Sequence, residues 1–79
     1  MVEMNKAIVD IAQTASEFSS SIVLQYDNKY IDVKSILGLY TSLVEVDKYE
    51  LHIHGKDEDA AKAKMKEVFS KYGLTVVLI

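Results

Sequence analysis

The sequence predicts a small α+β protein in which helices cover one face of a mostly antiparallel sheet. Apolar residues recur every three or four positions over about residues 5–18 and 57–72, a period typical of amphipathic helices. Over residues 21–26 and 48–54 apolar residues occupy every second position, as in strands buried on one face. Helices packed on one face of such a sheet bury both kinds of apolar surface. A chain of 79 residues has room for one core, so we expect a single domain over residues 1–79.

The composition argues against several classes of function. The chain has twelve acidic residues, nine basic residues that are all lysine, and a net charge of −3, so nothing in it resembles the positive surface of nucleic-acid-binding proteins. It has no cysteine, hence no disulfide and no thiolate. No apolar run approaches the roughly 18 residues of a membrane span, and Met1–Asn5 does not read as a targeting signal. We expect a cytoplasmic protein with no cofactor, no metal, and no nucleic-acid or membrane partner.

The first helix is expected over about residues 5–18 and is followed by a hairpin over residues 21–33. The apolar positions of the helix, spaced by three and four, are Met4, Ala7, Ile8, Ile11, Ala12, Ala15 and Phe18. A cluster of serines at residues 19–21 ends it. In the hairpin, two β-rich runs flank Asp27-Asn28, where Asn28 can adopt the left-handed conformation, and Lys29 is expected at the tip.

A short helix is expected next, over about residues 34–40 and ending before Val44. Ser35 is placed where its side-chain oxygen can cap the free N–H groups of the first helical turn. Only one stripe of so short a helix can face the core. We therefore expect Leu37 and Tyr40 to be more exposed than their apolar character suggests.

The last part of the chain predicts a strand, a helix and a second strand. Residues 48–54 alternate, and Asp57, Glu58 and Asp59 place acidic groups on the first turn of the following helix, where they match its dipole. Gly73 suits a left-handed cap at its end, with Leu74 as the accompanying apolar contact. Thr75–Ile79 is rich in β-branched residues and is expected to form a terminal strand. A right-handed crossover lays it parallel to strand 48–54.

Several segments resemble the HPr phosphocarriers of the bacterial phosphotransferase system, in the order in which that family has them. The most specific is Lys34-Ser35-Ile36-Leu37-Gly38, which resembles the family's KSIMG motif. The others are Gln13-Thr14-Ala15-Ser16 with Phe18, Ile22-Val23-Leu24 with Lys29 and Val33, Ser42-Leu43, and Gly55-Lys56-Asp57-Glu58-Asp59-Ala60. The resemblance covers about residues 8–72. It implies the HPr-like open-faced sandwich, here with an added C-terminal strand.

The resemblance ends where the family carries its phosphoryl group. The family's acceptor histidine lies in a G-x-H-A-R-P-A motif at the start of the first helix, which places that histidine at Met4 and the motif's arginine at Lys6. A thioether has no titratable nitrogen to accept a phosphoryl group. Ala7 also replaces the motif's proline. The resemblance therefore implies an HPr-like protein without histidine phosphocarrier activity, related to the phosphotransferase system and not itself an enzyme.

The family's first strand also has no counterpart before the first helix. We expect Thr75–Ile79 to fill that edge position beside strand 48–54, parallel to it where the family's own strand is antiparallel. An uncovered edge would invite pairing with another chain. A homodimer formed by edge pairing, or by exchange of the strand between two copies, remains the alternative.

Ser35 is the candidate regulatory site. In relatives from Gram-positive bacteria the matching serine is phosphorylated by an ATP-dependent HPr kinase, and the modified form binds a transcriptional regulator, so the resemblance implies these two partner classes. A phosphate at a helix N-terminus meets free N–H donors and the positive end of the helix dipole. The alternative is that Ser35 only caps the helix.

The apolar residues beside Ser35 are the candidate docking surface. The resemblance implies that this segment contacts protein partners, through Ile36, Leu37, Leu39 and Tyr40 with Lys34 at the rim. The alternative is that these side chains pack in the core, which must claim some of them.

His52 and His54 are the remaining candidates for chemistry. Their spacing puts both on one face of a strand, and Glu50 or Asp57 could add a carboxylate, but two histidines are too few for a typical metal site. Exposed positions on an amphipathic strand explain both residues without a ligand. No nucleophile, base and acid can be assembled elsewhere. Two alternatives stay open: a phosphocarrier with a non-standard acceptor, such as one of these histidines, and a structural paralogue with no phosphate chemistry.

Overall fold

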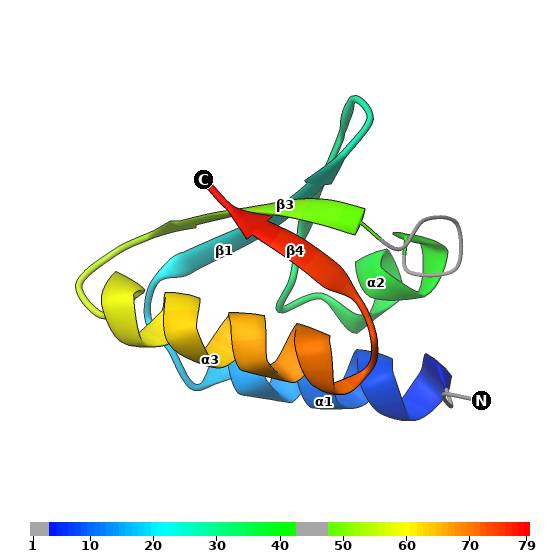
Figure 1. Cartoon of the computed structure of the whole chain (residues 1–79), viewed down its shortest axis with the longest axis horizontal. Helices are drawn as coiled ribbons and strands as arrows, with labels where there is room; N and C mark the ends of the chain where they lie inside the picture. The colour runs from blue at the N-terminus through cyan, green and yellow to red at the C-terminus, as the bar shows by residue number, and fades with distance from the viewer. Residues whose placement is uncertain (1–3, 43–47) are drawn as a thin grey trace.

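A computed structural model describes residues 4–42 and 48–79 of the chain, and the side chains of residues 5–40 and 48–79. The elements follow the predicted order: α1 (Met4–Ser16), β1 (Ser21–Tyr26), β2 (Lys29–Asp32), α2 (Ile36–Ser42), β3 (Lys48–His54), α3 (Glu58–Lys71) and β4 (Thr75–Leu78). In Figure 1, α1 and α3 lie side by side under one face of the sheet, and α2 lies at its end. The α+β open-faced sandwich is confirmed.

The sheet contains four strands in the order β2-β1-β3-β4. β1 pairs antiparallel with β2 and with β3, while β4 pairs parallel with β3. The predicted placement of β4 at the edge beside β3 is thus confirmed. No helix in residues 4–42 and 48–79 is long and apolar enough to cross a membrane.

The core lies between the sheet and the two long helices. Its residues are the apolar ones that recur every three or four positions in the helices and every second position in the strands. Tyr49 is 1% exposed and joins the layers, because its ring meets Tyr26 edge-on at 5.8 Å and Phe69 at 6.3 Å. The other buried apolar residues are Ala7, Ile8, Ile11, Ala12, Ala15, Ile22, Leu24, Val33, Leu39, Leu51, Ile53, Ala61, Met65, Val68 and Leu74.

Two local details differ from the sequence prediction. The positive φ of the hairpin turn falls on Asp27, at 52°, and not on Asn28; aspartate also tolerates this conformation. Lys29 opposes Tyr26 as the first residue of β2, so the tip is Asp27-Asn28 alone. α1 ends at Ser16, and the N–H of Phe18 donates to the carbonyl oxygen of Ala15 at 3.2 Å in a tighter final turn.

The predicted cap at the end of α3 is confirmed. Gly73 has a φ of 75°, and the N–H of Leu74 donates to the carbonyl oxygen of Phe69 at 3.0 Å, while the N–H of Gly73 donates to that of Ser70 at 3.0 Å. These are the two hydrogen bonds of a Schellman motif. Leu74 is buried beside them. The cap turns the chain back toward the sheet, so that β4 reaches β3.

Asp57 has a different role from the predicted one. It is the N-cap residue of α3, but its side chain makes no capping hydrogen bond. The carboxylate instead accepts hydrogen bonds from the N–H of Ser19 at 2.9 Å, the N–H of Ser20 at 3.0 Å and the hydroxyl of Ser20. These bonds, that of the Ser20 hydroxyl foremost, lower the pKa of Asp57 to about 2. Asp57 therefore joins the start of α3 to the segment that follows α1.

Gly55 permits this close approach. A Cβ atom at residue 55 would lie 2.6 Å from the Cα atom of Ser20, and the backbone has a φ of 152° there.

Two expectations concern residues whose side chains lie outside the described part of the chain. They are the resemblance at Ser42-Leu43 and the end of the short helix before Val44.

Candidate functional site

The segment that leads into α2 is anchored by its backbone and by one lysine. The N–H of Val33 donates to the carbonyl oxygen of Ile22 at 3.0 Å, which extends the pairing of the hairpin by one residue. The ammonium group of Lys34 donates to the carbonyl oxygen of Phe18 at 2.8 Å. Lys34 is half-buried, so its charge holds the end of α1 to this segment. Its place at the rim of a docking surface stays a prediction.

Ser35 is the N-cap residue of α2. Its hydroxyl oxygen accepts a hydrogen bond from the N–H of Gly38 at 3.3 Å, and its carbonyl oxygen accepts one from the N–H of Leu39 at 3.2 Å. Its own N–H donates to the carbonyl oxygen of Asp32 at 2.9 Å. The predicted cap is confirmed, and the residue is exposed, so its hydroxyl can be reached from solvent.

Gly38 sets how closely α2 approaches the sheet. A Cβ atom at this position would lie 2.6 Å from the Cγ2 atom of Ile31 in β2. Any larger residue would push the helix and the strand apart. The absence of a side chain thus allows the face of α2 that contains Gly38 to lie against β2.

The rotation of α2 separates its apolar residues into two groups. Leu39 is 0% exposed and belongs to the core, so its expected place in a docking surface is wrong: it lies on the one stripe that faces inward. Ile36, Leu37 and Tyr40 are exposed by 40%, 81% and 42%, which confirms the exposure expected of Leu37 and Tyr40. We call Ser35, Ile36, Leu37 and Tyr40 the α2 surface.

α1 packs against α2, and it begins at Met4, the position at which the resemblance predicts the family's acceptor histidine. Lys6, two residues further along the helix, is exposed. A shallow open pocket on this helix is lined by Asn5, Lys6, Val9, Asp10 and Gln13. None of these side chains is an imidazole. Val9, 37% exposed, was not identified from the sequence; an apolar residue outside the buried stripe is the signal that could have found it.

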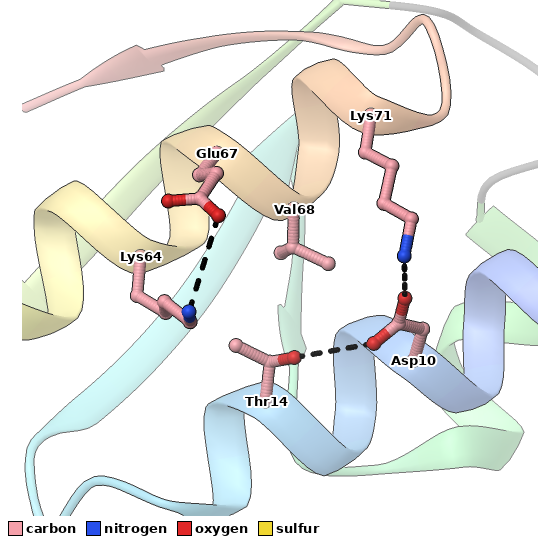
Figure 2. A pocket seen from close by; sticks show the side chains of 6 residues that line it. All are labelled: Asp10, Thr14, Lys64, Glu67, Val68 and Lys71. Carbon is pink, nitrogen blue, oxygen red and sulfur yellow. Dashed lines mark hydrogen bonds and ion pairs between the residues drawn. The ribbon is translucent and has the colours of Figure 1, made fainter.

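A second, smaller hollow lies in the seam between α1 and α3. Figure 2 shows that its charged groups point toward one another across the seam or along α3. The ammonium of Lys71 lies 3.2 Å from the carboxylate of Asp10, which also accepts a hydrogen bond from the hydroxyl of Tyr72 at 2.6 Å. The bond from Tyr72 lowers the pKa of Asp10 and raises that of Tyr72. These side chains form hydrogen bonds and ion pairs with one another, so the hollow is part of the packing between α1 and α3.

The two histidines lie on the face of the sheet opposite the helices. The Nε2 atom of His52 is 2.8 Å from the Oε1 atom of Gln25, and its ring lies 6.4 Å from that of Tyr30. His54 is exposed, and the carboxylate of Asp57 is occupied by Ser19 and Ser20. No group of three or more His, Cys, Asp or Glu side chains suited to a metal ion occurs among the described residues.

Comparison with known proteins places this geometry in a family. Residues 5–71, which run from α1 through the end of α3, match the family model described as the PTS HPr component phosphorylation site. The chain belongs to the HPr family of the phosphotransferase system. β4 lies beyond the matched residues.

Solved structures of HPr proteins have the same fold. An HPr dimer from Thermoanaerobacter tengcongensis is 33% identical, with a TM-score of 0.73, over 86% of this chain and 80% of that one. Crh of Bacillus subtilis, described as a catabolite repression containing protein whose dimer has a swapped domain, is 26% identical, with a TM-score of 0.75, over 89% and 82%. The histidine-containing phosphocarrier protein of a mycoplasma matches in fold, at 23% identity and a TM-score of 0.77 over 89% and 81%.

Proposed function

We propose that this HPr-family protein is a regulatory or adaptor domain that acts by protein–protein contact and carries no phosphoryl group on histidine. The observation that carries this proposal is the α2 surface, where Leu37 is 81% exposed and follows the exposed N-cap residue Ser35 by two residues. An exposed leucine next to two other exposed apolar side chains is typical of a surface that binds another protein.

The position of Met4 supports the loss of carrier activity. The family resemblance places the acceptor histidine there, and Lys6 stands at the position of the motif's arginine. The chain's histidines are His52 and His54, and both lie on β3 and not on α1. A side chain on the far face of the sheet does not present its nitrogen to a partner that docks on the start of α1 and on α2. The family's reaction therefore has no acceptor at its usual position.

Ser35 is the proposed site of control. Transfer of the γ-phosphoryl group of ATP to its hydroxyl oxygen would release the hydroxyl proton and add about −1.5 to −2 charges. The phosphate would lie within one helical turn of Ile36 and Leu37, so it would change an apolar surface into one with an anionic edge. An HPr kinase is the partner that would add the group, and a transcriptional regulator is the partner that would read it. The description of Crh as a catabolite repression protein supports a regulatory role.

The other parts of the proposal follow from the family. We propose a cytoplasmic protein that is not itself an enzyme and needs no cofactor, because membership of the HPr family supports each of these statements. Self-association is also proposed, since the HPr of Thermoanaerobacter tengcongensis and Crh are both described as dimers.

The experiment that tests control at Ser35 is intact-mass analysis after incubation with an HPr kinase and ATP. We expect one phosphoryl group on the unmodified chain and none on Ser35→Ala. Ser70→Ala, which removes an exposed serine from α3, is the matched control and should be labelled like the original. Labelling of Ser35→Ala would contradict the assignment, and no labelling of any form would favour a binding or structural paralogue without phosphate chemistry.

A further inference from the structure

The last strand presents a run of apolar residues that the fold leaves only partly covered. Val77 and Ile79 lie on the open face of the sheet and are 42% and 54% exposed. Val76 and Leu78 face the helices and pack against the core, but both remain half-buried. Four consecutive apolar residues therefore expose area on both faces of one strand.

The backbone of β4 is satisfied on one side. The N–H of Ile79 donates to the carbonyl oxygen of Leu51 at 2.9 Å, so the backbone groups of residues 75, 77 and 79 point toward β3. Those of Val76 and Leu78, which alternate with them, point away from β3 along the free edge of the sheet. Among the described residues β4 pairs with β3 alone. The edge thus offers two N–H groups and two carbonyl oxygens.

This edge lacks the features that keep strands apart. The side chains of Thr75–Ile79 carry no charge, and the segment contains no proline and no bulge. The opposite edge differs, since β2 carries Lys29 and Asp32 and is contacted by α2. Of the two edges, only that of β4 has no charged side chain and is apolar on its two faces.

A second copy of the chain fits this edge better than any charged partner does. The net charge of −3 repels two copies elsewhere, but the side chains of β4 bring no like charges together. An antiparallel β4 from a second copy, related by a twofold axis through Val77, places Val76 opposite Leu78 of the partner subunit. The outward-pointing groups of these two residues then bond in pairs. The same register places apolar side chains opposite one another on both faces.

We propose that this protein forms a twofold dimer in which the β4 strands of two copies pair antiparallel about Val77. The two four-stranded sheets become one continuous sheet, with the helices of both copies on the same face. Val77 opposes the partner's Val77 in a non-hydrogen-bonded pair, and Thr75 opposes the partner's Ile79. This inference rests on the self-association proposed above and is independent of any role of Ser35.

Disulfide trapping tests this register directly, because the chain has no cysteine of its own. In the proposed dimer the Cα atoms at position 77 are about 4.5 Å apart, within the range that a disulfide spans. We expect Val77→Cys to form a covalent dimer with oxidised glutathione. Val9→Cys, at a residue of similar exposure on α1, is the matched control and should stay monomeric on a non-reducing gel.

Two further variants fix the register. Thr75→Cys alone should not cross-link, because the two copies of residue 75 lie four residues apart along the pair, about 13 Å. An equimolar mixture of Thr75→Cys and Ile79→Cys should give a mixed disulfide dimer. If Thr75→Cys cross-links by itself while Val77→Cys does not, the register is wrong.

Sedimentation equilibrium of the unmodified full chain separates the other outcomes. We expect a monomer–dimer equilibrium that Val77→Lys weakens by roughly tenfold or more, because two ammonium groups then face each other across the axis. Val9→Lys should leave it unchanged, and circular dichroism should show both variants folded. A monomer at all concentrations overturns the dimer. A dimer that Val77→Lys leaves intact and Val77→Cys does not trap overturns the β4 interface and points to another one, such as strand exchange.

Discussion

The hydroxyl oxygen of Ser35 lies 3.3 Å from the backbone nitrogen of Gly38 and accepts its hydrogen bond. Two residues of the segment that resembles the HPr motif are therefore in contact with each other at the first turn of α2. One of them caps the helix, and the other lets the helix lie against β2. The exposed apolar residues of α2 owe their positions to this pair.

Removal of the Ser35 hydroxyl should destabilise the protein. Ser35→Ala leaves the N–H of Gly38 without its side-chain acceptor, which typically lowers the free energy of unfolding by about 1 kcal/mol. Urea denaturation measures this difference. Ser70→Ala removes an exposed serine within α3 and should cost less than Ser35→Ala. Equal costs for the two variants would show that the cap contributes nothing.

Gly38→Ala should also destabilise the protein, although alanine is the better helix former. The added Cβ would lie 2.6 Å from the Cγ2 atom of Ile31. Overpacking of this kind costs about 1–3 kcal/mol, which over most of this range exceeds the roughly 1 kcal/mol that alanine contributes as a helix former. In an Ile31→Ala background the clash is absent, so Gly38→Ala should there be neutral or stabilising. The same cost in both backgrounds would mean that the approach to Ile31 is not the cause.

Leu37 and Leu39 should respond differently to truncation, although they are two residues apart. Leu37 is 81% exposed, so Leu37→Ala should change the free energy of unfolding by less than about 0.5 kcal/mol. Leu39 is fully buried, and Leu39→Ala should cost about 2–5 kcal/mol. Denaturation of both variants checks the rotation of α2. A large loss of stability in Leu37→Ala would argue that its side chain serves folding and not contact with a partner.

The carboxylate of Asp57 should make stability depend on pH in acid. Folding lowers its pKa from 3.8 to about 2, so it stabilises the folded state fully above about pH 4, and this contribution is lost as the pH falls toward 2. Asp57→Asn removes the charge at nearly constant shape. The stability difference between the original protein and this variant should therefore shrink over that range, as measured by denaturation at a series of pH values.

The matched variant for Asp57 is Ser20→Ala, because the Ser20 hydroxyl is the largest cause of the lowered pKa. It should remove part of the same pH dependence, and the double variant should lose less than the sum of the two single losses. Strict additivity would show that the two residues do not act through one hydrogen bond.

The order of the elements could be predicted from the sequence because it depends on local periodicity. Ile8 and Ile11 repeat with a helical period, and Tyr49, Leu51 and Ile53 alternate with polar residues. The spacing therefore indicates which face of each helix or strand is buried. The end of α3 could also be predicted from the local sequence, because Gly73 and Leu74 form the cap with residues only a few positions away.

Contacts between distant segments could not be predicted in the same way. Nothing near Asp57 in the sequence shows that its carboxylate reaches Ser20, 37 residues earlier, and nothing near Asp10 points to Tyr72, 62 residues later. The burial of Leu39 has a similar cause. On a helix as short as α2 the pattern does not specify the rotation, which depends on the approach of Gly38 to Ile31.

The central claim is that this HPr-family protein retains a protein-binding surface without histidine phosphocarrier activity. The most direct measurement is intact-mass analysis of the chain after incubation with phosphoenolpyruvate and the first enzyme of the phosphotransferase system. The histidine-containing phosphocarrier protein of the mycoplasma, included in the same tube, shows that transfer occurs. We predict that the mycoplasma protein gains one phosphoryl group and that the mass of this chain does not change. An acid-labile phosphoryl group on this chain, which Met4 cannot accept, would contradict the claim and direct attention to His52 and His54.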